Sequence, residues 1–222
     1  MVDRIIEKTG PTVQLDSPAK TKGERTRERI LDVAYESIVE KGFAATSVEE
    51  LVEAAGITKS GFFYHFRDKN DMARQLFERF LGEDEAIIDT LEARAHELSD
   101  DPLQSFLIFL NLYAQMMDDM ETLHPGCMVA TVTYQERLFD PEVKRMNVEF
   151  LTRMRRRFRG SLDKIVAKHP PRIEVDLDAL ADHLTAIVEG AIILSKALND
   201  RSLMGRQARL FRNHIKLIFG VA

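Results

Sequence analysis

The fold of this chain is indicated most clearly by residues 46–69, which read TSVEELVEAAGITKSGFFYHFRDK. Two short stretches with a helical spacing of apolar residues flank Gly56, and a glycine there permits a sharp turn with positive φ. The apolar positions would lie on the facing sides of the two helices: Val48, Leu51, Val52, Ala55, Ile57 and Phe62. This pattern predicts a helix-turn-helix, in which two short helices pack at a steep angle around a tight turn.

Capping residues set the expected ends of these helices. Thr46 and Glu49 have the spacing of a capping box, so we expect Thr46 to cap the first helix. Thr58 is expected to cap the second helix, which runs to about Phe66, and Asp68 is expected to cap the helix that follows.

Helical patterns extend on both sides of this stretch, and the alternating pattern of a β-strand is not seen. Helix ends are marked by Gly42 and by the Asp-Pro pairs at 101–102 and 140–141, in which aspartate caps a helix that begins with proline. Further helices are expected over residues 24–41, 103–117, 177–198 and 208–219, with a break at His169-Pro170.

The chain is therefore expected to be all-α, with two domains. Residues 20–67 would form an N-terminal three-helix domain that contains the helix-turn-helix, and residues 68–222 would form a larger C-terminal helical domain. Residues 1–19 show no sustained period and are expected to form a flexible N-terminal arm.

The composition excludes several classes of protein. The 222 residues are 45% hydrophobic, which is ordinary for a globular chain, and no stretch reaches the roughly 18 apolar residues of a membrane span. The N-terminus lacks the apolar core of a signal peptide, and the one cysteine, Cys127, leaves no internal disulfide framework. We therefore expect a cytoplasmic protein.

Acidic and basic residues are unevenly distributed along the chain. A net charge of −5 argues at first against nucleic acid as a partner, but residues 20–69 contain nine basic and nine acidic residues, so the acidity lies mostly in the C-terminal region. Arg25 belongs to a basic cluster that either a solvated surface or phosphate contacts would explain. The arginines within 153–159 are expected to form a solvated face paired with acidic residues.

The second helix of the motif carries groups suited to DNA. Its first turn, Thr58-Lys59-Ser60-Gly61, presents a cation, hydroxyls and backbone N–H groups that can meet phosphates and base edges in a major groove. Two short helices joined at a glycine also occur in all-α cores that bind no DNA, so the pattern alone leaves both readings open.

Residues 46–69, together with Ile30-Leu31-Asp32-Val33-Ala34 and Lys41-Gly42-Phe43, resemble the N-terminal domain of the TetR family of transcriptional regulators. The resemblance implies a homodimer, most often a repressor, that binds a palindromic double-stranded DNA operator and releases it when a small molecule binds the C-terminal domain. It also implies DNA contacts at Thr46, Lys59, Ser60, Tyr64, His65 and Lys69, and a close approach of the backbone to DNA at Gly61. Arg25 of the basic cluster and Thr58 of the first turn complete the set of expected DNA contacts. Phe63 stands where family members commonly have a tyrosine that contacts a phosphate, a contact that Tyr64 could supply instead.

Aromatic and methionine side chains crowd more than one face of the helix expected over 103–117. Core packing is the ordinary explanation, and an apolar cavity for an apolar or aromatic effector is the alternative. The residues expected to line such a cavity are Phe106, Phe109, Tyr113, Met117, Met128, Thr131 and Tyr134.

The two closing helices carry apolar stripes that a monomer would leave exposed, and a four-helix bundle with a second copy would cover them. Glu189-Gly190-Ala191 also resembles the dimerising segment of many TetR-family members. The residues expected at the dimer interface are Leu184, Ile187, Val188, Ala191, Leu194, Phe211, Ile215 and Ile218.

Signals for other chemistry are weak. No phosphate-binding glycine loop, nucleophile elbow or metalloprotease motif occurs, so we expect no catalytic activity and no cofactor. The six histidines show no close ligand pair, which argues against a metal site, and Cys127 fits an inert thiol better than a sensor. Two alternatives remain: a helical small-molecule binding protein without operator function and, less favoured, an α-helical enzyme.

Overall fold

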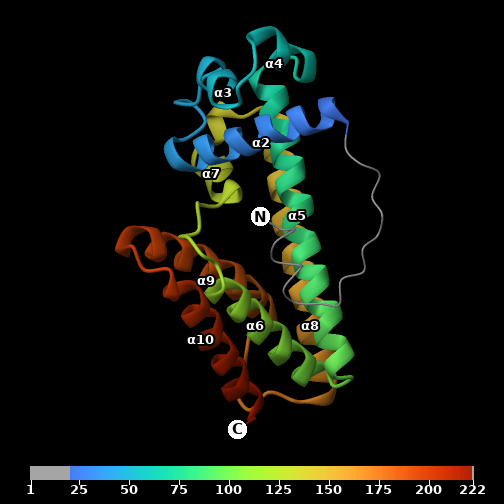
Figure 1. The fold of residues 1–222 in the computed structure, drawn as a ribbon. Helices are drawn as coiled ribbons and strands as arrows, with labels where there is room; N and C mark the ends of the chain where they lie inside the picture. Colours follow the sequence, from blue (N-terminus) through green and yellow to red (C-terminus); the bar gives the residue numbers. More distant parts are fainter. Residues whose placement is uncertain (1–20, 222) are drawn as a thin grey trace. The chain divides into compact units, whose positions relative to one another are not determined.

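The computed structural model describes residues 21–221, and these residues are almost entirely helical (Figure 1). No strand occurs within this range, which confirms the predicted all-α class; the predicted arm over 1–19 lies outside the described residues. The elements in chain order are α2 (Lys22–Lys41), α3 (Val48–Ala54), α4 (Lys59–His65), α5 (Lys69–Leu98), α6 (Pro102–Asp118), α7 (Met128–Tyr134), the 3-10 helix η1 (Glu136–Leu138), α8 (Pro141–Lys168), α9 (Leu177–Leu198) and α10 (Ser202–Phe219).

Most of the predicted helix ends are confirmed. The Asp101 carboxylate accepts from the backbone N–H of Leu103 and Gln104 at 3.1 and 3.0 Å, and Pro102 is the first residue of α6. Gly42 ends α2, and α8 ends directly before His169-Pro170. Proline and glycine therefore set these boundaries as expected, because each interrupts or terminates the helical hydrogen-bond ladder.

The cap of α3 differs from the prediction by one residue. Ser47, not Thr46, is the N-cap: its hydroxyl accepts from the backbone N–H of Glu50, whose carboxylate accepts from the Ser47 N–H at 3.0 Å. The Thr46 hydroxyl instead donates to the Gly42 carbonyl at 3.0 Å, and Thr46 is buried. Both positions have a glutamate three residues later, so only the burial of Thr46 decides between them.

By their internal packing, the described residues form two compact units. The first contains residues 21–84 and 127–147, and the second contains residues 85–126 and 148–221. The division therefore falls within α5 and within α8. It also places α7, which the sequence did not predict, with the helix-turn-helix.

The core of the first unit holds the helix-turn-helix together. Gly56 has φ of +61°, so the predicted left-handed turn between α3 and α4 is present. The largest fully buried side chains come from four helices and the end of α4: Ile30, Leu31 and Ile38 of α2, Leu51 of α3, Phe62 of α4, Phe66, and Met72, Leu76 and Phe77 of α5. Burying these apolar surfaces is the main stabilising contribution to a domain this small.

The second unit is a helical body in which α10 packs along α6 and α9 (Figure 1). Its arginine-rich helix α8 forms ion pairs with α5 and α9, which the sequence did not predict: Arg153 with Glu85, Arg155 with Asp182, and Arg157 with Asp89 and Glu92. Within residues 21–221, no helix is both long enough and apolar enough to cross a membrane.

Candidate nucleic-acid interface

Helix α4 divides its side chains between the core and the surface. Thr58 caps it, as predicted, because its hydroxyl accepts from the backbone N–H of Gly61 at 3.1 Å. Phe62 and Phe66 are buried, whereas Lys59 and Tyr64 are exposed, Tyr64 to 83%. Two rings therefore anchor the helix, and the exposed side is available to a partner.

The outward side combines aromatic, cationic and hydroxyl groups. Phe63 is exposed beside Tyr64, and Ser60 is exposed in the first turn with Lys59. The Tyr64 ring meets the edge of the His65 ring at 5.0 Å between centroids. An exposed helix with these side chains can donate hydrogen bonds to phosphates and base edges and make apolar contacts with thymine methyl groups.

Lys59 is paired within the protein. Its ammonium lies 2.7 Å from the Glu49 carboxylate, and both side chains are mostly exposed. The hydrogen bond from Lys59 lowers the pKa of Glu49, so the carboxylate is ionised at neutral pH. Exposed pairs contribute little to stability, so a phosphate could displace Glu49 from Lys59 at small cost.

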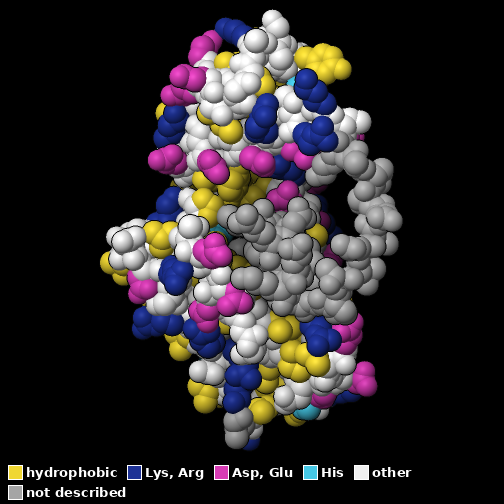
Figure 2. All heavy atoms as spheres, in the orientation of Figure 1, with side chains coloured by type: hydrophobic (Ala, Val, Ile, Leu, Met, Phe, Trp, Pro, Cys, Tyr) yellow, Lys and Arg dark blue, Asp and Glu magenta, His cyan; other side chains and the backbone are white. Residues whose placement is uncertain are grey.

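A second exposed pair lies next to it in the same unit. The Lys41 ammonium is 2.9 Å from Glu50, and the bonds from Lys41 and then from the Ser47 N–H and hydroxyl lower the pKa of Glu50 to about 2. Figure 2 shows acidic and basic side chains intermixed over the region of α3 and α4. The acidic and basic groups of α3 and α4 are therefore paired and intermixed, and the visible face of this region is not uniformly basic.

Three of the residues predicted to contact DNA make contacts within the protein. Thr46 is buried, with its hydroxyl bonded to Gly42 and Ser37, so it does not present that group to a partner. Lys69 is half-buried, donates to the Phe43 carbonyl and lies 4.2 Å from the centre of the Phe43 ring. The His65 ring contacts the rings of Tyr64 and Phe66, and burial, followed by the charge of Arg27, lowers the pKa of its imidazole.

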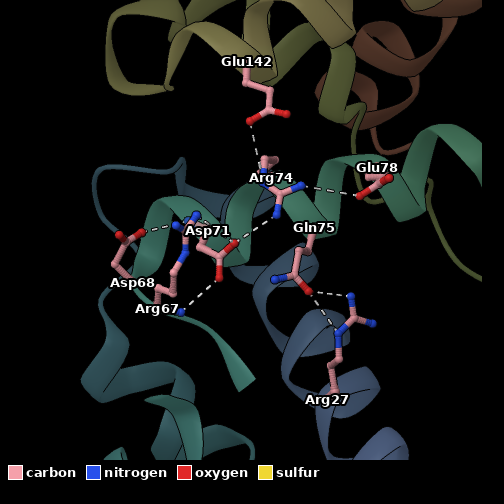
Figure 3. Close-up of polar contacts among 8 residues, drawn as sticks. All are labelled: Arg27, Arg67, Asp68, Asp71, Arg74, Gln75, Glu78 and Glu142. Carbon is pink, nitrogen blue, oxygen red and sulfur yellow. Dashed lines mark hydrogen bonds and ion pairs between the residues drawn. The ribbon is translucent and has the colours of Figure 1, made fainter. Parts of the chain in front are cut away.

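A polar network holds the turn between α4 and α5 (Figure 3). Asp71 is its centre: the carboxylate is only 7% exposed and accepts from the Arg67 backbone N–H at 3.0 Å and from the Arg74 guanidinium at 3.1 Å. Its own backbone N–H donates to the Asp68 side chain at 2.8 Å, which confirms Asp68 as the predicted cap of α5. These hydrogen bonds therefore connect the end of α4 to the start of α5.

The pKa of Asp71 shows which force dominates in this network. Burial by itself would raise it, but hydrogen bonds from the Arg67 N–H, Gln75 and Arg74 outweigh burial and lower it. Gln75 in turn accepts from the Arg27 guanidinium at 3.1 and 2.6 Å, which brings α2 into the same network. No sequence pattern singled out Gln75, because its partner Arg27 lies on α2. The partners of Asp71 are close in sequence, but its burial is not visible there.

The residues predicted to line an effector cavity fall in both units. In the second unit, Phe106 and Phe109 line a small pocket with polar groups from α5 and α8, and its space of about 30 Å³ suits water, not a drug-sized molecule. Tyr113 and Met117 are half-buried. In the first unit, Met128 is fully buried, Thr131 is half-buried and donates to the Cys127 carbonyl, and Tyr134 is 80% exposed.

The residues predicted at the dimer interface differ in how exposed they are in the single chain. Within the single chain, five of them are already buried: Leu184, Ala191, Phe211, Ile215 and Ile218. Ile187 and Val188 are half-buried, and Leu194 is exposed. The apolar side chains that these two helices actually expose are Ile193, Leu194, Leu198, Leu210 and Leu217.

Residues 30–76 match a protein family described as bacterial regulatory proteins, tetR family. The chain is 37% identical over 59 residues to the HTH-type transcriptional regulator AcrR of Shigella flexneri, covering 27% of each protein. It is 25% identical over 173 residues to the transcriptional regulator AcuR of Cereibacter sphaeroides, covering 76% of this chain and 75% of AcuR. A TetR-family transcriptional regulator from Agrobacterium tumefaciens has the same fold, with a TM-score of 0.72 and 20% identity over 87% of this chain and 98% of that one.

The helix-turn-helix and its match define a regulator-type DNA-binding domain, as found in bacterial transcription factors. Residues 30–76 are thus similar to the DNA-binding domain of the tetR family, as the resemblance of residues 46–69 implied. The alignment spans about a quarter (27%) of AcrR and three quarters (75%) of AcuR.

Proposed function

We propose that this protein is a ligand-responsive transcriptional regulator that binds a palindromic operator as a homodimer and acts as a repressor. The observation that carries the proposal is the exposed side of α4, with Lys59, Ser60 and Tyr64, on a helix-turn-helix whose other side is anchored by buried rings. The match of residues 30–76 to the TetR family supports the same assignment.

A second copy is needed because one recognition helix reads too little DNA to be specific. Two such helices must lie about 34–36 Å apart to enter successive major grooves. The exposed leucines and isoleucine of α9 and α10 supply a surface for self-association: Leu194 and Leu198 are four residues apart, and Leu210 and Leu217 are seven apart. That spacing keeps each pair on one face of its helix, as packing into a four-helix bundle requires.

The effector would act by changing this spacing. We infer that a small apolar or aromatic molecule binds the second unit near Phe106 and Phe109 and shifts α5, which continues into the helix-turn-helix. The small volume of the pocket means that binding must open it. Such a ligand causes release of the operator only if it binds the protein state that cannot bind DNA more tightly than the state that can.

DNA binding is tested by footprinting and fluorescence anisotropy on the region upstream of the gene and on sequences selected from a random pool. We expect specific binding that weakens as salt is added, so that log Kd rises linearly with the logarithm of the salt concentration. Replacing Lys59 by alanine should weaken binding about tenfold and reduce the salt slope by about one if Lys59 meets a phosphate. Lys41→Ala, which removes the other paired lysine of this unit, is the matched control.

The outcome that contradicts the proposal is the absence of specific, salt-sensitive binding at every selected sequence. If a small molecule still binds with unchanged affinity in that case, the helical small-molecule binding protein becomes the better description.

A further inference from the structure

Residues 127–147 pack in the first unit with the DNA-binding helices, although more than fifty residues separate them from α4 in sequence. Helix α7 contacts α2, and the segment continues at both ends, through Gly126 and Val148, into the second unit. This segment therefore connects the two units along the chain, as α5 does.

Gln135, at the end of α7, contacts the turn between α2 and α3. Its side-chain oxygen accepts from the backbone N–H of Phe43 at 3.0 Å, in a partly buried site. Its side-chain nitrogen would lie 2.6 Å from a Cβ placed on Gly42, whose φ is +90°. The amide of Gln135 therefore lies against the Gly42–Phe43 peptide, and only glycine allows so close an approach.

The same turn is held by two further contacts. The Phe43 ring stacks on Phe139, which also belongs to the segment, with centroids 4.6 Å apart. Lys69 also contacts Phe43: its ammonium donates to the Phe43 carbonyl and lies over the Phe43 ring. Because Ser47, the cap of α3, is only four residues further along the chain, the position of Phe43 limits where α3 begins.

The segment also reaches α5 through an ion pair. Glu142, in the first turn of α8, lies 3.9 Å from the Arg74 guanidinium, and Arg74 bonds Asp71 at the turn after the recognition helix (Figure 3). Glu142 is mostly exposed, so this pair alone contributes little. The partly buried bond of Gln135 is the stronger of the two polar contacts, because its loss would leave the Phe43 N–H without its partner.

We propose that Gln135 is a positioning residue for operator binding: it holds the α2–α3 turn through Phe43 and so keeps α3 and α4 in the geometry that reads DNA. The inference rests on the proposed function. It makes residues 127–147 a second connection, beside α5, between an effector-binding unit and the recognition helix. A ligand that prefers the state in which this bond is broken would weaken operator binding through it.

Two substitutions at one position separate the hydrogen bond from simple packing. Gln135→Met keeps the length of the side chain but removes the acceptor, whereas Gln135→Glu keeps an oxygen acceptor for the Phe43 N–H. We expect the methionine variant to weaken binding to the selected operator about fivefold, the factor that a typical net hydrogen bond represents. The glutamate variant should bind within about twofold of the wild type, and affinity for random DNA should not change in either.

A control variant tests for general destabilisation. Val132→Ala removes a buried side chain from α7 but leaves Gln135 in place, and it should lower the melting temperature with little effect on operator affinity. If it weakens operator binding as much as Gln135→Met does, the effect is one of stability and the proposal fails. The proposal also fails if the methionine and glutamate variants bind the operator equally well.

Amide hydrogen exchange tests the bond between the Phe43 N–H and Gln135 in the absence of DNA. The Phe43 amide should exchange slowly in the wild type and in the glutamate variant, and faster in the methionine variant. Equal exchange in all three would overturn the proposed bond. Failure of the wild type to bind any operator, by contrast, would contradict the proposed function itself, so the two failures are distinguishable.

Discussion

Neighbouring residues of α4 have different roles because the helix turns them toward the core or toward solvent. Phe62 and Phe66 are four residues apart and buried, whereas Phe63 and Tyr64, between them, are exposed. An aromatic run of this kind would be hard to assign from composition, but a spacing of four places two of the rings on one face.

At Tyr64, stability and DNA binding should be separable. Tyr64→Ala removes a side chain that is 83% exposed, so its free energy of unfolding should change by no more than about 0.5 kcal/mol, while operator affinity should fall. Tyr64→Phe removes only the hydroxyl, so its effect on operator affinity measures the contribution of that group. Urea denaturation and anisotropy measure the two properties.

The contrasting variant is Phe62→Ala, two residues earlier in α4 and on its buried side. It should destabilise the protein by about 3–5 kcal/mol, because it deletes a fully buried ring. A comparable loss of stability in Tyr64→Ala would show that Tyr64 belongs to the core instead.

Asp71 should contribute to stability through its charge. Asp71→Leu leaves the Arg67 N–H and the Arg74 guanidinium without their acceptor and should cost about 2–4 kcal/mol in urea denaturation. Because the pKa of Asp71 is lower in the folded protein than in the unfolded chain, its contribution is present at neutral pH and is lost as the pH falls below about 4. A variant as stable as the wild type at pH 7 would contradict this role.

At the scale of the helices, length and caps explain which elements were foreseeable. Glycine, proline and aspartate marked the ends of several long helices correctly. Helix α7 is as short as α3 and α4, but its N-cap, Cys127, makes no side-chain capping bond, so the sequence has no signal for its start. The one-residue error at α3 has a similar origin, because the choice between Thr46 and Ser47 depends on a hydroxyl buried against α2.

The dimer prediction is sharpened at this scale. Ile193 of α9 is 55% exposed, so Ile193→Arg should leave the fold intact and place a charge in the proposed interface, giving monomers in sedimentation velocity with reduced operator binding. Ala191→Arg is a poor test of the interface, because Ala191 is only 3% exposed and the arginine would disrupt the chain's own core.

Ala167→Arg, at an exposed position of α8, is the matched control and should remain dimeric. An intact dimer in Ile193→Arg would refute the placement of the interface on this face of α9.

At the scale of the molecule, the two units do not coincide with the two halves of the sequence. Residues 127–147 join the first unit, and α5 and α8 contribute to both. Arrangements of this kind depend on contacts between distant residues, such as Gln135 with Phe43, for which one sequence contains no local signal.

Stability of the second unit should depend on pH through His124. Burial, and then the charge of Lys196, lower the pKa of His124 to about 4, and its Nδ1 accepts from the Gly126 N–H at 3.2 Å, which requires that nitrogen to be unprotonated. The unfolded chain binds this proton near pH 6.5, so stability is complete above that pH and falls between about 6.5 and 4, by up to roughly 3 kcal/mol.

Denaturation at several pH values should therefore show a weaker pH dependence in His124→Asn, whose side-chain oxygen can still accept from Gly126. His214→Asn, at an exposed position, controls for the loss of an imidazole. Identical pH profiles for the wild type and His124→Asn would rule out this contribution.

The sequence by itself determined the all-α class, the helix-turn-helix over 46–69 and the similarity of this region to the tetR family, because local spacing, caps and turn residues carry that information. Only the tertiary structure decided which apolar stripes of α9 and α10 are core and which are exposed. It also showed that Thr46 and Asp71 are buried and that Gln135 bonds Phe43 in the turn between α2 and α3. The physical reason is that burial and long-range hydrogen bonds depend on what packs against a residue, and a helical period shows that a face is apolar without showing what covers it.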